Sequence, residues 1–198
     1  MRAAPVGLIA PIIGSDDAVF NLAAEVAGLT HGHPSGFLSA GHLAVTVASL
    51  LRGEALPTAL DAAGEQLRQR DGHREVADAI TAARAIAGRG WPKPEDLETL
   101  GGGWVAEEAL AIAICCALSA PNFQDGIILA ANHSGDSDST AAIAGNLLGV
   151  QLGEQAIPHD WLIELELRSD IGQVADDLYA VTTGKLTADA AWERYPGW

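Results

Sequence analysis

Residues 105–118 read VAEEALAIAICCAL, the most strongly helical stretch of the chain, and they decide the class of fold. Alanine is the best helix former, and its small side chain lets neighbouring helices pack closely. Cys115 and Cys116 are adjacent in this stretch and would point in different directions on a helix. We therefore interpret them as small buried hydrophobes without a mutual disulfide, a usage that fits a reducing cytoplasm.

Helical signals continue on both sides of this stretch. Ser15 before two aspartates indicates an N-cap, and Pro57 suits a first helical position. No segment alternates with period two, and the chain is 48% hydrophobic but only 5% aromatic. We expect a compact, multi-helix, all-α fold with a single domain over residues 1–198. The other expected helices run from 15 to about 32, 35 to 53, 57 to 67, 76 to 88, 125 to 131, 140 to 152, 158 to 167 and 171 to 182.

The charge balance narrows the choice of partner. The formal net charge is −15, from 11 basic and 26 acidic residues. Such a surface repels nucleic-acid phosphates and anionic membranes, so we expect neither as a partner. Pro5 and Pro11 interrupt the apolar N-terminal stretch, which lacks a clear signal-peptide cleavage site, and the run 37–51 is too short to span a bilayer. We expect a cytoplasmic protein.

The segment NHSGDSDSTAAIAGNLLG, residues 132–149, carries the most chemical information. Asp136 and Asp138 stand two residues apart in what reads as an extended loop, where alternate side chains project the same way. Both carboxylates could then converge on a hard cation such as Mg²⁺, and the Ser139 hydroxyl could add a third oxygen ligand. The helix that follows also offers free backbone N–H groups to an anion such as a diphosphate.

Two other interpretations of this segment remain open. An Asp or Ser ahead of an alanine-rich helix is usually only a cap. An aspartyl-nucleophile phosphatase also uses a D-x-D pattern, although there a β-strand should run directly into the first aspartate. An EF-hand is disfavoured because the central glycine and the distal glutamate are missing.

Four segments together resemble the ADP-ribosylglycohydrolase family: MRAAPVGL at 1–8, LTHGHPSGFLSAG at 29–41, GWVAEEALAIA at 103–113, and residues 132–149. The resemblance implies a Mg²⁺-dependent hydrolase that removes ADP-ribose from modified protein side chains or small conjugates. It also implies a pair of Mg²⁺ ions that position the ribose hydroxyls and an attacking water. By position, the implied metal ligands are Asp136, Asp138 and Ser139, and the implied substrate-binding residues are His31, His33, Trp104 and Glu107.

The family's glycine-rich G-D-x-x-G and T-D-D segments, which supply the other metal ligands, have no counterpart in this chain. The chain therefore resembles a C-terminal portion, and we expect an impaired enzyme whose remaining catalytic groups lie outside it. Apolar helix faces left uncovered would favour self-association. A catalytically dead ADP-ribose-binding module is the alternative of another class.

Overall fold

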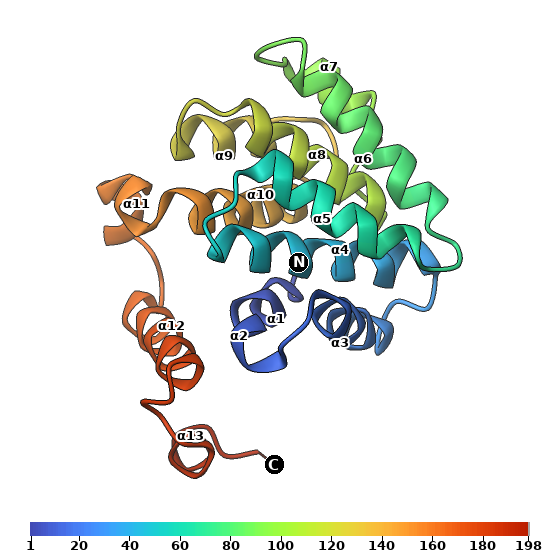
Figure 1. The fold of residues 1–198 in the computed structure, drawn as a ribbon. Helices are drawn as coiled ribbons and strands as arrows, with labels where there is room; N and C mark the ends of the chain where they lie inside the picture. Colours follow the sequence, from blue (N-terminus) through green and yellow to red (C-terminus); the bar gives the residue numbers. More distant parts are fainter. Residues whose placement is uncertain (198) are drawn as a thin grey trace.

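The computed structural model describes residues 1–197, and no strand occurs within that range. The expectation of an all-α fold is confirmed (Figure 1). The helices are α1 Ala4–Leu8, α2 Ala10–Ile13, α3 Asp16–Gly28, α4 Pro34–Leu51, α5 Leu56–Arg68, α6 Arg74–Ala87, α7 Pro94–Glu98, α8 Ala106–Ser119, α9 Phe123–Ala131, α10 Ser137–Leu152, the 3₁₀ turn η1 Glu154–Ala156, α11 His159–Ile163, α12 Arg168–Thr182 and α13 Ala188–Arg194.

Helix α8 lies at the centre of the core. It contacts α4, α6, α9 and α10, and every residue from 109 to 117 is buried (Figure 1). This explains why its sequence has no polar face, since a helix that is apolar all round needs partners on every side. Cys115 and Cys116 are free and fully buried, and burial raises the pKa of the Cys115 thiol to about 11. Their interpretation as small core hydrophobes is confirmed.

Helix α4 is the second core helix and runs across the molecule against α1, α3, α5, α8 and α10. Among the described residues, α4 is the one helix that is long and apolar enough to cross a membrane. However, 72% of it is buried inside the protein. That burial is what a core helix requires. His42 lies within α4 and is 1% exposed, and burial lowers the pKa of its imidazole to about 4. His42 is therefore neutral in the folded protein at physiological pH.

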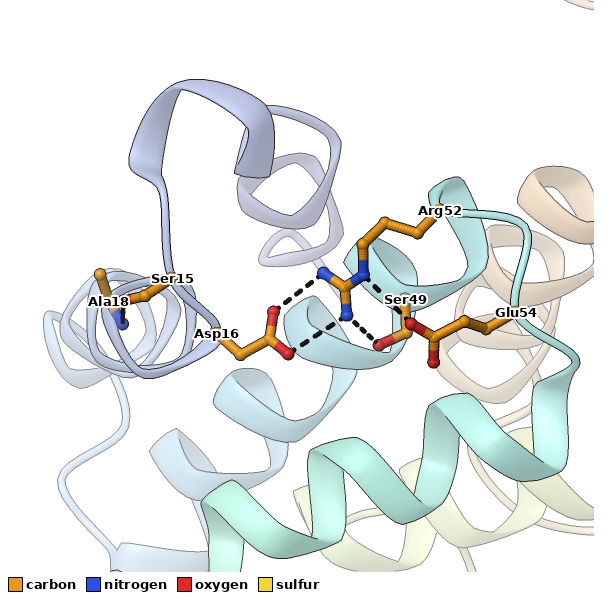
Figure 2. Close-up of polar contacts among 6 residues, drawn as sticks. All are labelled: Ser15, Asp16, Ala18, Ser49, Arg52 and Glu54. Carbon is orange, nitrogen blue, oxygen red and sulfur yellow. Dashed lines mark hydrogen bonds and ion pairs between the residues drawn. The ribbon is translucent and has the colours of Figure 1, made fainter.

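An arginine at the end of α4 connects three segments (Figure 2). The Arg52 guanidinium donates to both carboxylate oxygens of Asp16, at 2.9 and 3.1 Å, to Glu54 Oε1 at 3.1 Å and to Ser49 Oγ at 2.7 Å. Ser15 caps α3 as expected, by accepting from Ala18 N at 3.2 Å. The start of α3 is thus fixed against the end of α4, which sets the direction in which α3 approaches the cleft described below.

The last two helices stand apart from the main body and contact mainly each other (Figure 1). Asp177 of α12 accepts from the Arg194 guanidinium and, at 2.7 Å, from the Tyr195 hydroxyl. Asp177 is only 7% exposed, because the side chains of Arg194 and Tyr195 cover it. The helix expected over 158–167 ends at Ile163 instead, and Leu167, with a left-handed φ of 58°, precedes α12.

Two expected helix boundaries that border the cleft also differ from the structure. Helix α3 ends at Gly28 rather than near residue 32, which leaves residues 29–33 as a connection before α4. Helix α10 begins at Ser137, three residues before the expected start at Thr140. The short helix α7 was not expected; Pro94 opens it and Asp96 accepts from Lys93 N at 2.8 Å.

Candidate metal and ADP-ribose site

A cleft of about 860 Å³ opens where the end of α3 meets the first turns of α4, α8 and α10. Its volume lies in the range, about 300–1,000 Å³, of sites that bind small molecules and cofactors. Segments far apart in the sequence converge there, and the cleft collects most of the residues singled out from the sequence. Its lining includes His31, His33, Trp104, Glu107, Asp136 and Ser139.

The acidic motif forms the start of α10 and not an extended loop. Asp136 is the N-cap residue, whereas Asp138 and Ser139 already belong to the first helical turn. The expectation that alternate residues of a loop project together is therefore wrong in its geometry. Asp136 and Ser139 line the cleft, and Asp138 is an exposed residue outside that lining.

The Asp136 carboxyl is held in its charged form by its neighbours. A hydrogen bond with the Asp138 side chain, followed by one from the Ser139 hydroxyl, keeps its pKa below the ordinary value for aspartate. The carboxylate makes no capping hydrogen bond to α10, although the Ser139 backbone N–H lies close enough to lower the pKa further. Asp136 therefore occupies the N-cap position of α10 without a side-chain capping hydrogen bond, and its two interpretations, a helix cap and a metal ligand, both stay predictions.

A glycine loop fixes the backbone beneath Asp136. Asp136 N donates to Gly102 O at 2.7 Å, and the Glu108 carboxylate in turn accepts from the backbone N–H groups of Gly102 and Gly103, both at 3.0 Å. The approach of Gly102 to Gly135 is so close that a Cβ at Gly135 would stand 1.9 Å from Gly102 O. Only glycine fits at Gly135, so this motif glycine is explained by backbone contact. At Gly145, in contrast, an added Cβ would meet only a side chain, Ile127 Cδ1 at 3.6 Å.

A histidine within the motif holds the other side of the turn. His133 Nδ1 accepts from Gly135 N at 3.1 Å, which leaves its Nε2–H to donate to Thr140 Oγ1 at 2.8 Å. We assign this tautomer from the partners, because a backbone N–H can only donate. Thr140 is fully buried and passes its own hydrogen to Ala130 O at 2.7 Å. The two ends of the turn, α9 and α10, are therefore joined through one satisfied network.

The two histidines near the end of α3 have different local roles. His31 Nδ1 lies 2.8 Å from the Thr30 hydroxyl, just after the end of α3. His33 is the N-cap of α4, where Nδ1 accepts from Ser35 N at 3.3 Å. His33 Nδ1 also lies 3.7 Å from Glu75. His33 thus shapes the start of α4 as well as lining the cleft.

The start of α8 forms the opposite wall. Trp104 is 74% exposed, so it is not a core residue. One oxygen of Glu107 and the hydroxyl of Ser39 are buried without a hydrogen-bond partner within the described residues. Both residues line the cleft. Both atoms therefore remain free to form a hydrogen bond with water or with a bound ligand.

The oxygen donors at Asp136, Asp138 and Ser139 are of the kind that Mg²⁺ prefers. Within the described residues, however, no group of three His, Cys, Asp or Glu side chains is placed to hold a metal ion. Two carboxylates and a hydroxyl fill only part of an octahedral shell, so water or a further polypeptide would have to supply the remainder.

The phosphatase interpretation required a β-strand running into Asp136. The segment before the motif is helix α9, Phe123–Ala131, followed by the turn at 132–136. That interpretation is wrong, because α9 replaces the expected strand and the aspartate begins a helix instead of ending a strand.

Sequence reasoning missed four residues that this site uses. Arg2 and Ser39 line the cleft, and Glu108 and His133 hold its acidic turn. All four stand inside the segments that carry the family resemblance, so their polar character was visible there. The role of Glu108 depends on the fold-back of the glycine loop onto α8, for which the sequence offers only the run Gly101–Gly103.

The fold is all-α, with one cleft at the first turns of α4, α8 and α10, and comparison with known proteins shows its family. The ADP-ribosylglycohydrolase family model matches residues 1–187, and the chain belongs to this family. A solved structure described as an ADP-ribosylglycohydrolase-related protein complex superposes with a TM-score of 0.69 and 29% identity, over 87% of this chain and 57% of that one.

Two of the similar curated proteins are named ADP-ribosylarginine hydrolase Tri1. The Pseudomonas putida (strain GB-1) protein is 29% identical over 112 residues, 55% of this chain and 30% of that protein. The Serratia proteamaculans (strain 568) protein is 36% identical over 82 residues, which are 41% of this chain and 22% of that protein. An uncharacterized protein of Archaeoglobus fulgidus is 29% identical over 180 residues, which are 90% of this chain and 56% of that protein. The chain thus spans less than a third of the two hydrolases' length.

Proposed function

We propose that this chain carries one wall of an ADP-ribose site and part of a Mg²⁺ site, and that it serves the hydrolysis of ADP-ribose from modified protein side chains. The observation that carries the proposal is the convergence of Asp136 and Ser139 with His31 and Trp104 on one cleft of about 860 Å³. The names of the two hydrolase relatives favour ADP-ribosylated arginine as the substrate.

The residues of this chain would contribute binding and orientation. The exposed Trp104 indole offers a flat face on which an adenine ring can stack. His31 lies where an imidazole can contact a ribose hydroxyl or a phosphate. Asp136, Asp138 and Ser139 would hold Mg²⁺, which when bound supplies orientation of the ribose hydroxyls and of a water at the anomeric carbon.

The overall reaction replaces the bond from the anomeric carbon to the side-chain nitrogen or oxygen by a bond to a water oxygen, and one water proton passes to the leaving atom. In this chain no residue is assigned as the general base. The buried, unpartnered oxygen of Glu107 marks the part of the wall where a further group would complete the site.

The test is calorimetric titration of ADP-ribose into the purified chain with and without Mg²⁺. We expect Mg²⁺-dependent binding that is lost in Asp136→Asn and kept in the control Asp78→Asn, an exposed acidic residue of α6. ADP-ribose binding that does not depend on Mg²⁺ and that is unchanged in Asp136→Asn would contradict the metal assignment. No ADP-ribose binding by folded protein would contradict the proposal for this chain.

The alternative is a binding module that does not hydrolyse. A release assay on arginine- and serine-modified proteins separates the two, because a module binds ADP-ribose and releases none. Release from the arginine-linked protein alone would support the substrate favoured by the relatives.

A further inference from the structure

A second cavity, of about 490 Å³, lies at the turn between α5 and α6, and we call it the side pocket. Its lining shares His33 and Glu75 with the lining of the cleft, and His33 Nδ1 lies 3.7 Å from Glu75 Oε2. The two cavities therefore meet at this pair of residues. An extended residue spans about 3.3–3.6 Å, so a polypeptide with one side chain in the cleft has neighbouring residues at the side pocket.

The side pocket gathers positive charge on an acidic chain. Three arginines line it, Arg68, Arg70 and Arg74, against the two carboxylates of Asp71 and Glu75. The chain as a whole has 11 basic and 26 acidic residues, and the lining of the cleft has one arginine beside three carboxylates. A negatively charged segment is therefore attracted to the side pocket more than to the cleft.

Each of the three guanidinium groups can take a further partner. Arg74 is exposed and forms no ion pair within residues 1–197. Arg70 donates to Asp17 and lies 5.0 Å from the centre of the Phe20 ring, while its Nε is buried without a partner among the described residues. Arg68 pairs with a glutamate three residues earlier, and both side chains are more than half exposed. Such a surface pair is weak, so an incoming carboxylate can replace it.

The turn that carries these arginines is fixed in place. His73 Nδ1 donates to Arg70 O at 2.8 Å. Gly72 has a φ of +77°, and a Cβ there would stand 2.9 Å from Pro34 Cβ, so the turn packs directly against the first residue of α4. Helix α6 begins at Arg74 without a side-chain cap, so the positive end of its dipole adds to the charge of the arginines.

We propose that the side pocket binds an acidic segment of the ADP-ribosylated protein, with Arg70 and Arg74 contacting carboxylates next to the modified side chain. This inference rests on the proposed function, because the modified protein is the substrate there. It goes beyond that function by giving the polypeptide, and not the ADP-ribose, its own surface. A carboxylate fits better than a phosphate, because Asp71 and Glu75 in the same lining oppose the charge of about −1.5 to −2 that a phosphate carries.

The experiment compares peptides that differ only beside the modified residue. One peptide carries ADP-ribose on an arginine between glutamates, the second has glutamines in their place, and free ADP-ribose is the third ligand. Calorimetric titration uses the wild type, Arg74→Gln, Arg74→Glu and the control Arg89→Gln, an exposed arginine outside both linings. If a peptide turns over, the ratio of kcat/KM values replaces the ratio of affinities.

The wild type should bind the glutamate peptide about 3- to 10-fold more tightly than the glutamine peptide, because more than one exposed ion pair can form. This preference should shrink in about 0.5 M salt, which screens exposed charges. Arg74→Gln should reduce the preference to less than about twofold, and Arg74→Glu should make the glutamine peptide the tighter ligand. Free ADP-ribose should bind all four proteins within about twofold, a result that a general loss of structure would not give.

Two outcomes would overturn the side pocket while leaving the proposed function standing. One is equal affinity of the wild type for the two modified peptides. The other is a preference for glutamate that persists unchanged in Arg74→Glu. A third peptide with phosphoserine in place of one glutamate tests the carboxylate, and tighter binding of that peptide would overturn this part of the assignment.

If the wild type binds no ADP-ribose, the proposed function fails, and the side pocket is judged with the unmodified glutamate and glutamine peptides. The readout is the NMR signals of the backbone amides at residues 70–75. Shifts that saturate with the glutamate peptide and disappear in Arg74→Glu support the side pocket, and no shift in the wild type overturns it.

Discussion

The glycine loop beneath Asp136 is anchored by a single side chain, and its removal gives the sharpest test of how the site is built. Glu108 accepts two backbone N–H bonds, each 3.0 Å long. Hydrogen bonds to a charged group contribute about 1.5–3 kcal/mol each, and the part-buried position argues for the lower value. Glu108→Ala should therefore lower the free energy of unfolding by about 3 kcal/mol. Because 1 kcal/mol corresponds to about 2–4 °C in a domain of this size, the Tm should fall by about 6–12 °C.

Thermal unfolding followed by circular dichroism measures this shift. Glu108→Gln keeps a carbonyl oxygen that can accept both bonds, so it should cost about 1 kcal/mol. Glu95→Ala, on an exposed acidic residue of α7, serves as the control and should leave the Tm unchanged. Hydrogen exchange at the Asp136 amide should accelerate in Glu108→Ala, because its acceptor is the Gly102 carbonyl. A Tm within about 2 °C of the wild type, with unchanged exchange, would refute the role of Glu108 as an anchor.

Three further changes probe the site and the core. Gly135→Ala should lower the free energy of unfolding by about 2–4 kcal/mol, because the new Cβ would stand 1.9 Å from Gly102 O. Urea unfolding measures this change, and an unchanged free energy of unfolding would contradict the close contact. Thr140→Val should lower the free energy of unfolding by about 1–3 kcal/mol, because Ala130 O and His133 lose their hydrogen-bond partner. An unchanged midpoint of urea unfolding would argue against that network. Burial depresses the pKa of His42 to about 4 from 6.5, so its contribution is present above pH 6.5 and is lost as the pH falls towards 4. Between pH 7 and 5 the wild type should lose about 2 kcal/mol more than His42→Leu, and parallel stability curves would contradict this.

The helices of the core could be predicted because their signals are local. The apolar run of α8, the Ser15 cap and the proline at the start of α5 each depend on neighbouring residues, and the structure places helices at all three. The start of α10 was misplaced for a physical reason. Ser137, Asp138 and Ser139 favour caps and turns over helix interiors, but the hydrogen bond from Asp136 N to Gly102 O fixes the backbone before them and lets the helix begin early.

The residues of the candidate site were predicted in part. His31, His33, Trp104, Glu107, Asp136 and Ser139 were expected from the family resemblance, and the structure brings all six to one cleft. Asp138 lies beside that cleft but outside its lining. The supporting contacts of Glu108 and the bond from Arg2 to Thr30 could not be predicted, because each joins a side chain to a segment whose position only the tertiary fold determines.

The separation of α12 and α13 from the main body has a practical consequence. Among residues 144–197 none lines the cleft, and the contacts of these two helices are mainly with each other. An element with so few contacts to the core can open locally at a small fraction of the global unfolding free energy. A protease should therefore clip near Leu167, whose left-handed backbone marks the junction, long before it reaches α4 or α8. For the same reason a fluorescent label or an affinity handle on α13 would report on the protein without touching the ligand site.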